Sequence, residues 1–158
     1  MTSRRRRTVT VERVIPAAPE LIFAVLASPA QHAVLDGSGM LQGTPSGPDH
    51  LHLGARFSMA MKQGPFRYRS VNDVTEYEQD RSLAWRTTGQ WRDRALVGGQ
   101  WWRYTLVPVE GGTLVRHSYE WGRATLATLT VWLPRYPQRM ARAMPRTLER
   151  LEGIVLRR

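Results

Sequence analysis

Apolar and polar residues alternate with a period of two through most of residues 40–122, and this spacing is typical of β-strands. Glycine, proline or charged residues interrupt the alternation at 64–65, 78–81, 98–99 and 110–112. Because these interruptions are short, we expect turns there and an antiparallel, meandering order of strands. The large apolar side chains occupy every second position of each strand, so one face of the sheet should cover a core.

The residues before this region predict one further strand and two short helices. β-Branched residues dominate 8–15, which we interpret as a strand. Helices are predicted over 19–27 and 29–35, because each carries a proline in its first turn and the first has apolar residues three and four positions apart. Ser28 is placed to cap the second helix, and Gly37 to end it as a C-cap glycine.

The C-terminal part of the chain predicts one long amphipathic helix over 136–156. Its apolar residues recur every three or four positions, at Met140, Met144, Leu148, Leu151 and Val155. Pro145 lacks the N–H group that a helix interior needs, so we expect a kink near Met144. The preceding residues 123–137 have an apolar middle that is too short to span a membrane, and we interpret them as a lid helix.

The order of these elements predicts an α+β fold. One strand, two short helices, about six antiparallel strands and a long helix follow one another, and segregated helices pack on one face of such a sheet. The 158 residues are enough for one domain with a single core. We therefore expect one domain over residues 8–158, preceded by a basic N-terminal tail over residues 1–7.

Charge and composition narrow the expected partners. The chain has 23 basic and 13 acidic residues, a net charge of +10, of which Arg4–Arg7 contribute four. We expect a solvated arm there and do not expect nucleic-acid binding, while contact of Arg4–Arg7 with an anionic membrane or RNA is the less favoured alternative. The chain has no cysteine, no recognisable secretory signal and no membrane-spanning run, so we expect a cytoplasmic protein.

Three phrases of the sequence carry a family resemblance. They are VIPAAPELIF at 14–23, WRYTL at 102–106 with GGTLV at 111–115, and TLERL at 147–151. Together they resemble the START-like superfamily of polyketide cyclases, dehydrases and lipid-transport proteins, also called SRPBCC. The resemblance implies a helix-grip fold: a curved seven-stranded antiparallel sheet around a long C-terminal helix, two short helices after the first strand, and a cavity inside. Most members bind small molecules, and a minority are enzymes.

In a helix-grip fold, alternate residues of each strand point toward the cavity. We take the alternate positions that carry apolar side chains as the ones on that face. The candidate ligand-binding residues are Phe57, Met59, Tyr68, Asn72, Trp85, Trp102, Tyr104, His117, Tyr119, Met140 and Met144. Ser70 and Thr87 share the inward parity with Asn72 and His117, and an unpaired polar group there would cost about 1–3 kcal/mol. We interpret His117 first as a structural histidine, and only His117 and Tyr104 are candidates for acid–base catalysis.

A histidine, a carboxylate and a hydroxyl also lie close together at His32, Asp36 and Ser38. The spacing of four between His32 and Asp36 predicts a hydrogen bond or salt bridge along one helical turn. In the turn that follows, Asp36 or Ser38 can bond neighbouring backbone amides. We therefore interpret this stretch as structural and not as a Ser-His-Asp triad. His50 and His52 supply no patterned set of three or four ligands, so we predict no metal site.

The leading hypothesis is a protein that binds a hydrophobic small molecule, lipid-like or aromatic and polyketide-like, without a cofactor. The alternative that the resemblance implies is a polyketide cyclase or dehydratase, in which the cavity folds the substrate and His117 or Tyr104 moves protons. The sequence has no phosphate-binding loop, nucleophile elbow or zinc-protease motif. Glu76 and Glu78 are expected to face solvent, and both a monomer and a homodimer are compatible with the sequence.

Overall fold

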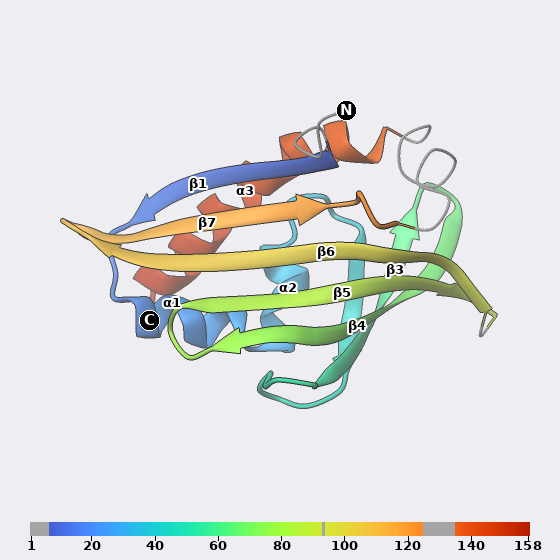
Figure 1. The fold of residues 1–158 in the computed structure, drawn as a ribbon, viewed down its shortest axis with the longest axis horizontal. Coiled ribbons are helices and arrows are strands. Elements are labelled where there is room, and N and C mark those ends of the chain that lie inside the picture. Colours follow the sequence, from blue (N-terminus) through green and yellow to red (C-terminus); the bar gives the residue numbers. More distant parts are fainter. Residues whose placement is uncertain (1–6, 93, 125–134) are drawn as a thin grey trace.

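The computed structural model describes residues 7–92, 94–124 and 135–158. In chain order its elements are β1 (Thr8–Ile15), α1 (Pro19–Leu26), α2 (Pro29–Leu35), β2 (Leu41–Ser46), β3 (Arg56–Gln63), β4 (Phe66–Glu78), β5 (Ser82–Trp91), β6 (Arg94–Val109), β7 (Gly112–Glu120) and α3 (Tyr136–Leu156). The strands form one seven-stranded sheet in the order β1-β7-β6-β5-β4-β3-β2, and all neighbours are antiparallel (Figure 1). The α+β helix-grip fold expected from the sequence is confirmed.

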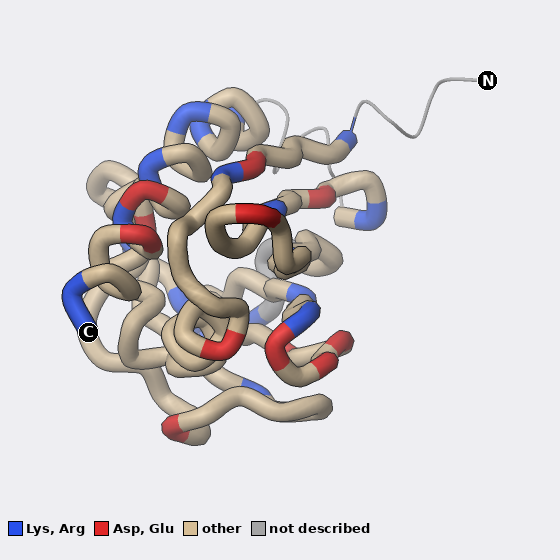
Figure 2. Tube along the Cα trace, turned by 90° about the vertical axis from the view of Figure 1, so that its left-hand side faces the viewer, with Lys and Arg blue, Asp and Glu red and all other residues tan. Residues whose placement is uncertain are grey.

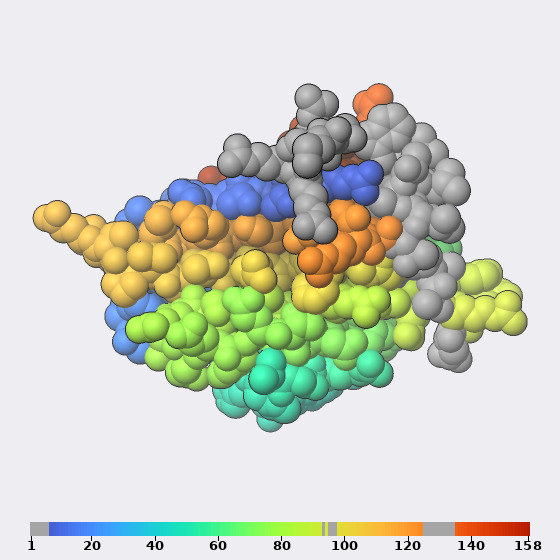
Figure 3. Space-filling view, viewed as in Figure 1, coloured from blue at the N-terminus to red at the C-terminus, as the bar shows by residue number. Residues whose placement is uncertain are grey.

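The helices lie on one side of the sheet, and α3 crosses its inner face (Figure 1). On the outer side, β1, β7, β6 and β5 lie side by side, and no helix of the described chain covers them (Figure 3). This arrangement explains the period of two, because alternate side chains of each strand face either the helices or solvent. In β7, for example, Val115, His117 and Tyr119 are buried, whereas Arg116 is exposed.

The larger hydrophobic core lies at one end of the space between the sheet and the helices. Ile22 and Phe23 of α1 are fully buried there, together with Leu151 of the C-terminal half of α3 and Leu83 of β5. The N-terminal half of α3 instead borders a cavity. The last turns of α3 therefore pack in the core, and its first turns border the cavity.

One predicted turn is absent, because β6 continues through Gly98 and Gly99 for a total of 16 residues. Gly99 has a positive φ of 83°, and a Cβ added to it would lie 2.3 Å from the carbonyl oxygen of Arg123. The register between β5 and β6 also shifts around Gly89. These glycines therefore permit a bulged strand and a close approach of the backbone after β7, and they do not end a strand.

Two further expectations have different outcomes. The period-two pattern did not single out β2, since Gly43 and Pro45 interrupt it within Leu41–Ser46. The long C-terminal helix is confirmed and passes through Pro145 as one element, while the kink near Met144 stays a prediction. Of the segment 123–137 that we interpreted as a lid helix, residues 125–134 lie outside the described part of the chain.

Acidic and basic residues are interspersed along the Cα trace (Figure 2), and several form ion pairs. Glu76 contacts Arg103 at 2.8 Å and Glu78 contacts Arg81 at 3.1 Å. The two glutamate side chains are 40 % and 60 % exposed, so both carboxylates face solvent as expected. Among the residues of the tail, 1–6 lie outside the described chain. No helix in the described ranges is long and apolar enough to cross a bilayer.

Candidate functional site

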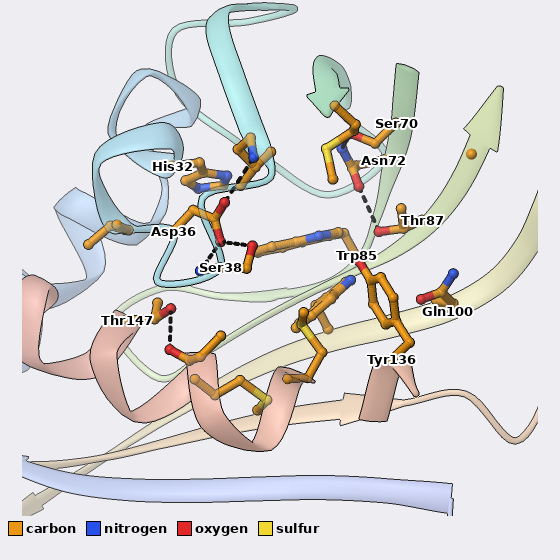
Figure 4. Close-up of a pocket in the computed structure, with 18 of the residues that line it drawn as sticks. His32, Asp36, Ser38, Ser70, Asn72, Trp85, Thr87, Gln100, Tyr136 and Thr147 are labelled. Atoms are coloured by element: carbon orange, nitrogen blue, oxygen red, sulfur yellow. Dashed lines mark hydrogen bonds between the residues drawn. The ribbon is translucent and has the colours of Figure 1, made fainter. Parts of the chain in front are cut away.

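A cavity of about 210 Å³ lies between the inner face of the sheet, α2 and the first turns of α3 (Figure 4). Aromatic and aliphatic side chains make up just over half of the described lining residues, and polar side chains, including one carboxylate, make up most of the rest. Of the predicted ligand-binding residues, the structure places eight in the wall: Tyr68, Asn72, Trp85, Trp102, Tyr104, His117, Met140 and Met144. Residues from β4, β5, β6, β7 and α3 thus meet at one space.

The other three predicted residues, Phe57, Met59 and Tyr119, do not border this cavity in the structure. Each is at most 2 % exposed and packs in the core beside the cavity. The Phe57 ring lies against His32 and Trp85, with ring centroids 5.3 and 5.6 Å apart. The parity of a strand shows which face a side chain shares, but the position of the void along that face depends on the helices opposite.

His32 lines the cavity from α2, although its sequence position suggested a bond to Asp36. That expectation was wrong: His32 Nε2 donates to the carbonyl oxygen of Leu26 at 2.8 Å. Its ring stacks on Trp85 with centroids 5.2 Å apart. Burial lowers the pKa of His32, partly offset by the bond to Leu26, so the imidazole is neutral near pH 7.

Asp36 and Ser38 form the turn after α2 and bond neighbouring amides, as predicted. Asp36 Oδ1 accepts from Ser38 N at 2.9 Å and from Ser38 Oγ, and Asp36 Oδ2 accepts from Leu41 N at 2.9 Å. Ser38 Oγ in turn accepts from Met40 N at 3.2 Å. Both polar groups are therefore committed to the turn, which leaves no Ser-His-Asp triad here. The described residues contain no cluster of three or more His, Asp or Glu side chains that could hold a metal ion.

Two helix-end expectations at α2 were wrong. The Ser28 side chain makes no capping bond. Gly37 does not have a positive φ, and Asp36 is the C-cap residue. Gly37 is instead in contact with α3: a Cβ added to it would lie 2.3 Å from the Ala143 carbonyl oxygen, and its N–H donates to Thr147 Oγ1 at 3.1 Å. The missing side chain permits this approach, which holds α2 against α3 at the edge of the cavity.

Three polar side chains of the wall, Ser70, Asn72 and Thr87, have hydrogen-bond partners within the protein (Figure 4). Thr87 Oγ1 donates to Asn72 Oδ1 at 2.7 Å. Asn72 Nδ2 lies 3.4 Å from the Phe57 carbonyl oxygen, and Ser70 Oγ lies 3.4 Å from that of Met59. These contacts across β3, β4 and β5 offset most of the cost of burying the groups.

His117 is different, because neither of its ring nitrogens has a hydrogen-bond partner among the described residues. The side chain is 3 % exposed, and its ring stacks on Tyr104 with centroids 4.0 Å apart and an angle of 11° between the planes. Burial lowers the pKa of His117 to about 3. Burial, together with the nearby charge of Asp36, raises the pKa of Tyr104. Both side chains are therefore uncharged near pH 7.

Gln100, Tyr136 and Thr147 also line the cavity, and the sequence interpretation missed them. Gln100 has the same parity in β6 as Trp102, so the pattern could have included it. Its side-chain oxygen accepts from the Tyr119 hydroxyl. Tyr136 lies one turn before Met140 in α3, at a spacing of four that places both side chains on one face.

Stability should fall as the pH falls below about 6.5. Between pH 3 and 6.5 the unfolded chain protonates His117 and the folded protein does not, so the free energy of unfolding rises with pH by up to about 1.4 kcal/mol per unit. Urea denaturation at pH 6.5, 5.5 and 4.5 measures this, with His117→Phe as the comparison. The stability of wild type relative to the variant should decline as the pH falls; parallel pH profiles would contradict the assignment.

The geometry defines a helix-grip protein, in which a curved antiparallel sheet and a C-terminal helix enclose an apolar cavity. The chain belongs to the polyketide cyclase / dehydrase and lipid transport family. The sequence model of this family matches residues 6–154. The START-like, or SRPBCC, resemblance is thereby confirmed. Membership in this family implies a cavity for a hydrophobic ligand, and the space described above has that character.

Several solved structures share this fold over nearly the whole chain. Protein MLL2253 from Mesorhizobium loti has a TM-score of 0.68 at 21% identity and covers 96% of this chain and 98% of its own. Protein Ms6760 from Mycobacterium smegmatis has a TM-score of 0.69 at 16% identity and covers 99% and 95%. At such identities the likeness shows the fold alone.

A relative among curated proteins matches only part of the chain. The uncharacterized protein Rv0088 of Mycobacterium tuberculosis is 37% identical over 76 residues, which are 48% of this chain and 33% of that protein. The match thus spans about a third of the length of this relative.

Proposed function

We propose that this protein binds a compact hydrophobic molecule, aromatic or polyketide-like, in the cavity between the sheet and α3. One observation carries the proposal: about 210 Å³ of space is lined by aromatic and aliphatic side chains, with several polar groups among them. A hydrophobic guest gains from the burial of its surface, at about 25 cal/mol per Å².

The cavity volume favours a ligand of one or two rings. An apolar cavity of about 150 Å³ is large enough for benzene. A space of about 210 Å³ therefore suits a molecule somewhat larger than benzene. It is too small to enclose a whole sterol or a long acyl chain, so a lipid-like ligand ranks second.

The protonation states favour binding over acid–base catalysis. A general base is most effective when its pKa lies near the working pH. Burial holds the pKa of His117 at about 3, and Tyr104 keeps its proton because its pKa is raised. A neutral imidazole and a neutral phenol are suited to hydrogen bonding with a ligand. The cyclase or dehydratase alternative would need a substrate that raises the pKa of His117 by several units.

A ligand panel tests the proposal directly. The protein is titrated with a two-ring aromatic such as 1-naphthol, a fatty acid and a sterol, and thermal unfolding and tryptophan fluorescence are recorded. The two-ring aromatic should raise the unfolding temperature and change the fluorescence, because Trp85 and Trp102 line the cavity. If no member of the panel changes either signal, the proposal fails, and if only the fatty acid or the sterol binds, the compact aromatic class is wrong.

A further inference from the structure

Resting on the proposed function, we infer that the cavity selects an uncharged aromatic molecule that bears a hydroxyl group, with His117 as the group that binds this hydroxyl. The inference combines three features of the cavity: the unpartnered buried imidazole, the neighbouring polar groups that already have partners, and the negative charge of Asp36 among the described lining residues.

The imidazole of His117 offers one donor and one acceptor that the described protein does not use. The Tyr104 ring lies parallel to it at 4.0 Å and so covers a face of the ring. Hydrogen bonds of an imidazole lie in the plane of its ring, so stacking does not satisfy them. Each buried unpaired group costs about 1–3 kcal/mol. Both ring nitrogens are fully buried, so a ligand hydroxyl reaches one of them only when the imidazole or a neighbouring side chain turns aside. The hydroxyl, which can donate or accept, would then offset the cost of that one nitrogen.

Several other polar groups of the wall already have partners within the protein. Asn72 and Thr87 bond each other at 2.7 Å, and the Gln100 side-chain oxygen accepts from Tyr119. His32 uses Nε2 on the Leu26 carbonyl. Among the described lining residues, His117 is the one whose buried side-chain nitrogens have no partner.

The charge in the wall disfavours an anionic ligand. No Lys or Arg occurs among the described lining residues, and the single charged one is Asp36. Its negative charge acts as far as Tyr104, where it contributes to the raised pKa. Arg139 influences Tyr68, but it is exposed on α3 and does not line the cavity. A carboxylate would lose its hydration here and gain no counter-charge, which is strongly unfavourable.

Three probes of nearly the same shape test the inference on the wild-type protein at pH 7: naphthalene, 2-naphthol and 2-naphthoate. We expect 2-naphthol to bind about tenfold more tightly than naphthalene and at least tenfold more tightly than 2-naphthoate. Isothermal titration calorimetry and tryptophan fluorescence quenching give the three dissociation constants. This comparison needs no variant, so it does not depend on whether a substituted protein folds.

Two variants then locate the effect. His117→Phe should lose most of the preference for 2-naphthol over naphthalene. Ser118→Ala is the matched control, since Ser118 lies on the other face of β7 and bonds Thr10 at 3.0 Å; its affinities should equal those of wild type. Retention of the full 2-naphthol preference in His117→Phe would overturn the role of the imidazole.

The outcomes separate this inference from the proposed function. Equal affinities for naphthalene and 2-naphthol, or tightest binding of 2-naphthoate, would overturn the inference while compact hydrophobic binding stands. Failure of all three probes to bind would remove the proposed function, and the inference with it.

Discussion

Replacing Ala143 with phenylalanine is expected to abolish binding of a two-ring ligand, with a loss of at least thirtyfold in affinity. Ala143 lies on the inner side of α3 in the wall of the cavity and is 7 % exposed. The added phenyl ring would occupy the space of about 210 Å³ that the ligand needs. Because the ring enters a void, we expect the variant to fold and to lose no more than the about 1–3 kcal/mol that overpacking typically costs.

The chain offers a matched control two residues away. Ala141 is exposed on the opposite side of the same helix, so Ala141→Phe adds the same ring without entering the cavity. Titration of wild type and both variants with 1-naphthol, followed by tryptophan fluorescence, measures the effect. Unchanged affinity in a folded Ala143→Phe variant would show that the ligand binds elsewhere.

Substituting Gly37 with alanine should cause a large loss of stability for a single added methyl group. The new Cβ would lie 2.3 Å from the carbonyl oxygen of Ala143 and 3.0 Å from the amide nitrogen of Thr147, both backbone atoms of α3. The helix cannot yield locally, so the turn after α2 must move and lose its bond to Thr147. Overpacking and the lost hydrogen bond together should cost about 2–4 kcal/mol.

Urea denaturation gives this value, and Gly39→Ala in the same turn is the control. Gly39 has a positive φ of 71° but no atom within 4 Å of an added Cβ, so its substitution should cost only about 1–2 kcal/mol of backbone strain. Gly37→Ala should also weaken ligand binding, since Asp36 and Ser38 border the cavity. If the two variants are equally stable, close contact between the turn and α3 does not decide the stability.

Features that depend on neighbours along the chain were predictable. Alternation assigned Trp85, Tyr104 and His117 to one face, and the structure places all three at the cavity, because strand geometry sends alternate side chains to opposite sides. The turn at Glu110–Gly112 and the amphipathic helix over 136–156 were predictable for the same reason. The family resemblance added the number of strands and the expectation of an internal space.

Features that depend on how distant segments of the chain approach one another could not be predicted from the sequence. Tyr119 and His117 share a face two residues apart, yet His117 borders the cavity, while Tyr119 is fully buried and bonds Gln100. The partner of His32 is a backbone carbonyl of α1, and no spacing within α2 indicated it.

Local periodicity thus established the faces of the strands and helices and the residue types available on them, since these follow from backbone geometry over a few residues. The size of the cavity, the satisfied state of Asn72 and the unpartnered state of His117 arose from the packing of α2 and α3 against the curved sheet. Those properties depend on distances between segments far apart in the chain, and such distances exist only once the core has formed.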